Sequence, residues 1–156
     1  NMAPRQHMRK MKVGKVTFTE AYKAVNEYRQ KFPQKAVTFY AQNYPAMGWA
    51  VFMAGGSCPV IPCTDKAFLK DAAAMEVEET STDEYKKMVK SDIGSIIYSK
   101  SGTEIPVQLS SGKYVLKYIH PASGKIETIN KSLKINGLYN LKVPDKKEGI
   151  YWFHKL

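Results

Sequence analysis

From residue 85 to the C-terminus, the sequence is a succession of strand-like segments separated by turn residues. Turn pairs such as Ser101-Gly102 and Asn136-Gly137 lie between them, at intervals of about 8 to 12 residues that are typical of an antiparallel sandwich. The expected strands are Gly94 to Ser99, Glu104 to Leu109, Lys113 to His120, Gly124 to Ile129 and Gly149 to His154, with weaker ones at Tyr85 to Lys90 and Leu138 to Val143. We therefore predict a β-sandwich over residues 81–156.

Before residue 80, helical patterns alternate with short apolar runs. Thr17 and Glu20 form a capping-box pattern, followed by an apolar stripe that predicts a helix from about Phe18 to Lys31. A second helix, apolar nearly all round, is expected with Asn43 as its cap and a proline in its first turn. A third is expected from Lys66 to Met75.

Two short segments between these helices read as buried strands, namely Lys35 to Tyr40 (KAVTFY) and Cys58 to Pro62 (CPVIP). Two strands joined by a buried crossover helix form a βαβ unit, which requires a parallel sheet. Residues 1–80 are therefore predicted to form a partial parallel, barrel-like βα segment of about three helices and two strands, which makes the whole chain α+β. Because two strands cannot form such a sheet alone, we expect this segment to dock against further sheet from a longer precursor or a partner chain.

The stretch MAGGSCPVIPCTD, residues 53–65, holds both cysteines and a glycine pair. The glycines are placed to close the preceding helix, because glycine adopts the left-handed conformation without strain. On one continuous strand Cys58 and Cys63 would point to opposite faces, which favours free buried thiols over a disulfide. The stretch is thus predicted to be mainly structural.

The chain carries a net charge of +10, which raises the possibility of nucleic-acid binding. Its lysines are spread from Lys10 to Lys155, and neither an RNA-binding aromatic motif nor a glycine-rich phosphate loop is present. The histidines lack metal-ligand spacing, so neither a metal nor another cofactor is predicted. The longest apolar run, Ala46 to Ala54, is shorter than the roughly 20 residues that cross a bilayer, so no membrane span is predicted.

Three runs carry a resemblance to a known class of protein: FTEAYKAVNEYRQKFPQKAVTFYAQNYPAMGWAVFMAGGSCPVIP, GKYVLKYIHPASGKIETINKSLKINGLYNLKVP and the closing GIYWF. Together they resemble the C-terminal part of glycoside-hydrolase-like bacterial proteins, in which a (β/α)8 barrel is followed by a small β-sandwich of the collagen-binding type. The resemblance covers nearly the whole chain. It implies action on plant or other complex polysaccharides, in the periplasm or outside the cell.

In the barrel implied by this resemblance, Lys35 to Tyr40 corresponds to the seventh strand and Cys58 to Pro62 to the eighth. Barrel glycosidases place two carboxylates at the C-terminal ends of strands, commonly the fourth and the seventh. The residues at the end of the seventh-strand candidate are Tyr40, Ala41, Gln42 and Asn43, which include no carboxylate. We therefore predict no catalytic residue in this chain, and whether it acts as an enzyme stays open.

Carbohydrate-binding candidates lie at the same strand ends. Tyr40 and Tyr44 could stack on sugar rings, Gln42 and Asn43 could bind hydroxyl groups, and Asp65 lies at the end of the eighth-strand candidate. Core packing is an equal alternative for the two tyrosines, and a helix-cap role is favoured for the aspartate.

The sequence is compatible with three functions. The first is the C-terminal portion of a polysaccharide-active, glycoside-hydrolase-like protein, which supplies barrel closure and an accessory sandwich. The second is a non-catalytic carbohydrate-binding or scaffold module. The third, which the dispersed lysines do not favour, is a basic nucleic-acid-binding protein.

Overall fold

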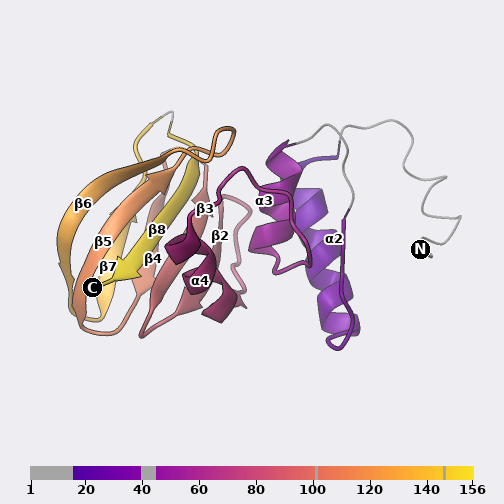
Figure 1. The fold of residues 1–156 in the computed structure, drawn as a ribbon, viewed down its shortest axis with the longest axis horizontal. Helices are drawn as coiled ribbons and strands as arrows, with labels where there is room; N and C mark the ends of the chain where they lie inside the picture. The colour runs from indigo at the N-terminus through magenta and orange to yellow at the C-terminus, as the bar shows by residue number, and fades with distance from the viewer. Residues whose placement is uncertain (1–15, 40–44, 101, 146) are drawn as a thin grey trace, which may run out of the picture.

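The computed structural model describes residues 16–39, 45–100, 102–145 and 147–156, and within them the chain is α+β. The helices are α2 (Phe18–Lys31), α3 (Pro45–Met53) and α4 (Lys66–Ala74). The strands are β1 (Glu76–Glu78), β2 (Tyr85–Lys90), β3 (Gly94–Ser99), β4 (Glu104–Gln108), β5 (Gly112–Ile119), β6 (Ile126–Ile135), β7 (Leu138–Lys142) and β8 (Gly149–Lys155). Helices α2 and α3 lie to one side of the strands, and α4 lies between them and the C-terminal strands (Figure 1).

The strands form two antiparallel sheets. The larger has the order β1-β2-β3-β8-β5-β6, and the smaller pairs β4 with β7. Apolar side chains between the sheets include Ile105, Val107 and Leu141 from the smaller one and Tyr151 and Phe153 from β8. The predicted antiparallel, sandwich-like arrangement of the second half is therefore seen, without a closed barrel.

The first helix begins and ends where the sequence predicts. The Thr17 side chain accepts a hydrogen bond from the backbone of Glu20, whose carboxylate in turn accepts one from the Thr17 backbone at 2.8 Å. The third helix has Asp65 as its cap and ends one residue before the predicted end. Residues 45–53 form the predicted second helix, while the expected cap, Asn43, lies outside the described residues.

The two predicted parallel strands are absent, which corrects the barrel-like part of the sequence interpretation. Neither residues 36–39 nor residues 58–62 form a strand; Tyr40 is not described. The segments meet through a backbone hydrogen bond of 2.7 Å from the Ser57 N–H to the Val37 carbonyl. Pro59 and Pro62 remove two donors, and Cys58 has φ 53°, so this run lacks the backbone of a regular strand.

One apolar core joins the helices to the outer face of the larger sheet. It contains Trp49 and Phe52 from α3, Phe68 from α4, and Ile96 and Trp152 from β3 and β8. The division at residue 80 therefore lies within a shared core. The two-domain interpretation stays a prediction, which the number of unfolding transitions can test.

We predict that the folded protein loses stability at alkaline pH, because three buried tyrosines have raised pKa values in the folded state. Burial raises the pKa of Tyr22 and of Tyr151 to about 12, and burial together with a hydrogen bond to Glu148 raises the pKa of Tyr98 further. Because each pKa is raised in the folded state, the stabilisation is complete below pH about 10 and is lost as the pH rises through the folded values. In a titration at 295 nm, we expect Tyr22, Tyr98 and Tyr151 to ionise only with unfolding. Ionisation of all three near pH 10 in the folded protein would contradict this.

Candidate functional site

The residues predicted to bind carbohydrate are only partly placed. Tyr40, Gln42, Asn43 and Tyr44 lie outside the described residues. Asp65 is half-buried, and its Oδ1 accepts a hydrogen bond of 2.8 Å from the Phe68 N–H. This carboxylate therefore caps α4, as the structural interpretation favoured, and a contact with a ligand stays untested.

Helix α3 lies directly on the backbone of the 58–62 segment. A Cβ atom at Gly48 would lie 1.7 Å from the carbonyl oxygen of Val60. The Val60 side chain itself is 85% exposed. Helix α3 thus packs closely on the backbone of a segment that presents an apolar side chain to solvent.

We expect Gly48→Ala to destabilise the protein by about 1 to 3 kcal/mol, because the new methyl group would overlap the Val60 carbonyl. This penalty outweighs the gain in helix propensity, about 1 kcal/mol, of alanine over glycine. Urea denaturation followed by far-UV circular dichroism measures the change. Ala73→Gly, at an exposed position of α4, is a reference for helix propensity alone. A Gly48→Ala variant as stable as the parent would show that α3 does not approach the segment this closely.

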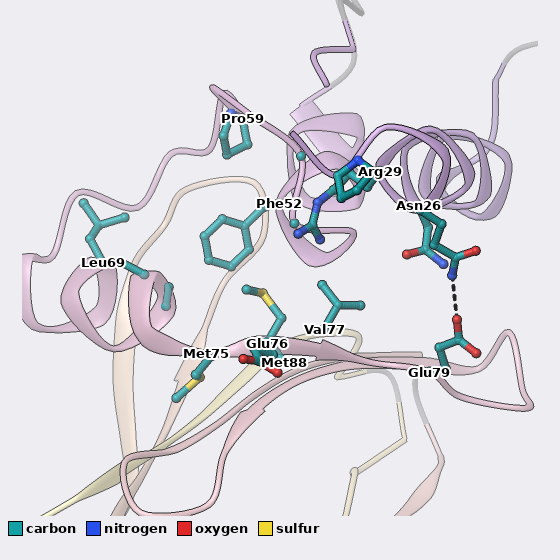
Figure 2. A pocket seen from close by; sticks show the side chains of 16 residues that line it. Asn26, Arg29, Phe52, Pro59, Leu69, Met75, Glu76, Val77, Glu79 and Met88 are labelled. Atoms are coloured by element: carbon teal, nitrogen blue, oxygen red, sulfur yellow. Dashed lines mark hydrogen bonds between the residues drawn. The ribbon is translucent and has the colours of Figure 1, made fainter. Parts of the chain in front are cut away.

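A cleft of about 720 Å³ lies between the two C-terminal ends of α2 and α3 on one side and α4, β1 and β2 on the other. Figure 2 shows its apolar side chains, with Phe52 and Leu69 from the helices and Met75 and Met88 beside the strands. Figure 2 also shows polar side chains at its far end, among them Asn26 and Glu79. Glu79 accepts a hydrogen bond of 2.6 Å from Gln30. The cleft therefore combines apolar surface with hydrogen-bonding groups.

One arginine at this cleft has a fixed position. The Arg29 Nη1 atom donates a hydrogen bond of 3.0 Å to the carbonyl of Ala54, at the C-terminal end of α3. Gly55 is needed there, because its φ is +66° and a Cβ atom would lie 2.2 Å from the same nitrogen. Arg29 thus brings a cation to the cleft while it caps a helix end.

The acidic run from Glu76 to Glu84 lines part of the cleft, and the sequence did not predict this. An acidic run of this kind is typical of a solvated connection, whereas its first three residues form β1. The signal was the alternation in Glu76-Val77-Glu78, which puts Val77 toward the core and the glutamates outward. Further along, Asp83 pairs with Lys23 of α2 at 2.8 Å, and hydrogen bonds from lysines lower the pKa of Asp83.

A second polar cluster lies under α4. Asp71 is 7% exposed, and its Oδ2 accepts a hydrogen bond of 2.9 Å from Trp152 Nε1 and lies 2.7 Å from His154 Nδ1. The aspartate is on α4 and both partners are on β8, so this cluster ties the helix to the sheet. No motif in the sequence connects Asp71 with His154, because only the fold brings these residues together.

The cysteines and metal ligands add no reactive centre within the part of the chain that is described. Cys58 and Cys63 are both free, as expected, but Cys58 is exposed rather than buried. Burial raises the pKa of the Cys63 thiol, which makes it a weaker nucleophile at neutral pH. No group of three potential metal ligands is present among the described residues, and none of their helices is long and apolar enough to cross a bilayer.

Comparisons with known proteins give a match to one family model and weak similarities to solved structures. A family model described as "Domain of unknown function (DUF6298)" matches residues 1–75. No curated protein matches the sequence. A solved structure titled "Glycoside hydrolase" is similar with a TM-score of 0.39 and 14% identity, over 53% of this chain and 20% of that chain.

A second solved structure is titled "Crystal structure of CapF with inhibitor 3-isopropenyl-tropolone". It is similar with a TM-score of 0.25 and 12% identity, over 88% of this chain and 44% of that one. Similarities at these TM-scores do not show a shared fold. The chain spans 20% of the length of the first structure and 44% of the second.

Proposed function

We propose that this chain is the C-terminal portion of a polysaccharide-active, glycoside-hydrolase-like protein, which acts in the periplasm or outside the cell. In that protein it contributes barrel closure and an accessory sandwich of the collagen-binding type. It does not contribute a complete catalytic carboxylate pair. The sequence resemblance supports the class, and one structural observation supports the role.

That observation is the pair of segments at residues 36–39 and 57–62. They meet through the hydrogen bond from Ser57 to Val37, and α3 packs on the second of them at Gly48. Neither segment is paired in a sheet, and Val60 is exposed. Two barrel strands whose neighbouring strands came from elsewhere would have a helix packed on one side and exposed apolar residues on the other. Helix α3 and the exposed Val60 fit this description.

Dye binding and oligomeric state test the missing-sheet part of the proposal. We expect the isolated chain to bind a dye specific for exposed apolar surface, or to self-associate through this face. Val60→Ser should lower the dye signal, whereas Leu138→Ser, at another exposed apolar residue, should leave most of it. A compact monomer that binds no dye would contradict the proposal that a sheet is missing.

Affinity electrophoresis tests the carbohydrate part. The chain is run in native gels that contain single plant or bacterial polysaccharides, and the release of reducing ends is assayed separately. We expect retarded migration with at least one polymer and no release of reducing ends. Unchanged migration with every polymer would reject carbohydrate binding, and release of reducing ends would reject the absence of a catalytic pair.

Among the described residues, those that line the cleft are our candidates for contact with a sugar. A sugar ring presents apolar C–H groups and polar hydroxyl groups, and the cleft places an apolar wall beside polar side chains. Glu76→Gln combined with Glu79→Gln should reduce the retardation, since carboxylates accept hydrogen bonds from hydroxyl groups more strongly than amides do. Glu84→Gln combined with Glu104→Gln removes the same charge from exposed positions elsewhere. Equal effects of the two pairs would remove the cleft from the proposal.

A non-catalytic carbohydrate-binding module is the second candidate, and the shared core favours it. Side chains from α3, α4, β3 and β8 pack together, and no buried side-chain polar atom among the described residues lacks a hydrogen bond. Such a chain could fold and bind a glycan by itself. Retardation by a polysaccharide together with a dye-silent monomer would favour this function over the first.

A further inference from the structure

The outer face of the β5–β6 pair carries a row of lysines. Residues directly opposite each other in an antiparallel pair share a face, and Lys113 of β5 is opposite Lys134 of β6. Lys117, four residues along β5, lies on the same face of that strand and opposite Thr128. Lys113 and Lys134 are exposed, and Figure 1 shows β5 and β6 at the end of the sheet away from α2 and α3.

β5, β6 and β8 place no acid on this face, and the carboxylate that reaches it from α4, Asp71, contacts Trp152 and His154. The one acidic residue of β5, β6 and β8 is Glu127, which is opposite Tyr118. Tyr118 belongs to the core between the sheets, so Glu127 is on the other face. Like charges directly opposite each other destabilise a sheet, so the Lys113–Lys134 pair carries an energetic cost that an anionic partner would relieve.

The neighbouring strand holds this face in place. Lys117 Nζ lies 4.2 Å from the centre of the Trp152 ring, which orients that cation over β8. His154, next along the same face of β8, is opposite Val115 and is fixed by its contact with the buried Asp71. The side chains of this part of the face are therefore positioned by the fold.

We infer that this lysine face binds a polysaccharide whose repeating unit carries a carboxylate. The inference rests on the proposed function, and it adds acidic polymers as a substrate class bound at a face separate from the cleft. Across the strands the lysines are about 5 Å apart and along β5 about 13 Å, a spacing that suits charges repeated along an extended polymer. A nucleic acid is less well matched, because the aromatic rings of β5 and β8 are buried and leave no surface on which bases could stack.

Polygalacturonate and the same polymer after reduction of its carboxyl groups test the inference, by affinity electrophoresis of the whole chain at low and high salt. We expect binding of the charged polymer that weakens with salt, and little binding of the reduced one. Lys113→Gln combined with Lys134→Gln should weaken binding about tenfold. Lys90→Gln combined with Lys100→Gln removes the same charge from exposed residues outside this face, and should change binding little.

The remaining outcomes distinguish a failure of this inference from a failure of the proposed function. Equal losses in the two double variants, or equal binding of the charged and reduced polymers, would overturn the lysine face while carbohydrate binding stands. Tighter binding of duplex DNA than of polygalacturonate would overturn it in favour of a nucleic acid. Binding of neither a charged nor a neutral polysaccharide would overturn both. All variants replace exposed residues, and circular dichroism checks that each one folds.

Discussion

Replacement of Trp49 by alanine is expected to lower the free energy of unfolding by about 3 to 5 kcal/mol, the range measured for large aromatic residues in cores. The Trp49 side chain is fully buried, and its ring packs edge-on against Phe52 and Phe68. Its Nε1 atom donates a hydrogen bond of 2.8 Å to the carbonyl of Pro121, in the turn between β5 and β6. The residue therefore connects α3 to the second half of the chain.

Urea denaturation measures this change, with Trp49→Phe as the matched control. Phenylalanine keeps an aromatic ring but not the N–H group, so the hydrogen-bond part should cost about 1 kcal/mol. In both variants Trp152 remains as a fluorescent probe of the sheet. If the core is shared, the fluorescence and far-UV transitions should coincide. A loss below about 1 kcal/mol for the alanine variant, or two separate transitions, would contradict the shared core.

The second large effect is expected for Asp71→Ala, at about 2 to 4 kcal/mol. The substitution leaves the buried Trp152 N–H without an acceptor and removes the contact with His154. It also removes the polar contacts that join α4 to β8. Because an unpaired buried donor costs more than the hydrogen bond itself gains, the loss should exceed that of an ordinary surface contact.

Asp71→Asn is the conservative control, since its amide oxygen can still accept from Trp152 while the charge is removed. We expect a smaller loss, and Asp92→Ala, at an exposed turn residue, should stay within about 0.5 kcal/mol of the parent. Thermal and urea denaturation give the values, and the emission maximum of Trp152 reports its environment. A change within about 0.5 kcal/mol for Asp71→Ala would show that the buried cluster does not stabilise the fold.

The strands of the second half could be predicted because their signals are local. Alternating apolar residues and the turn residues between them gave β2 and β3 with the observed bounds. The prediction for β6 was too short, because it ended at Ile129, where a register shift begins. From there to Ile135 the strand is mostly exposed, so its pattern lacks the apolar alternation that marks a half-buried strand.

The same kind of pattern failed for residues 36–39 and 58–62. Short apolar, β-branched runs predict strands, but a strand requires a neighbour with which to exchange backbone hydrogen bonds. Here one hydrogen bond, between Ser57 and Val37, joins the two segments. The candidate site also joins residues distant in sequence. Arg29 is on α2, Met88 is on β2 and Glu79 is in the loop between β1 and β2, and no spacing in the sequence connects them.

By itself, the sequence determined the three helices, the capping of α2 and α4, and the antiparallel second half. These depend on contacts between residues a few positions apart, such as the pairing of Thr17 with Glu20. Only the tertiary structure decided that Asp71 joins α4 to β8, and that Lys113 and Lys134 share a face on which β5 and β6 place no acid. Those relations join residues distant in sequence, and they follow from strand register and core packing rather than from local propensity.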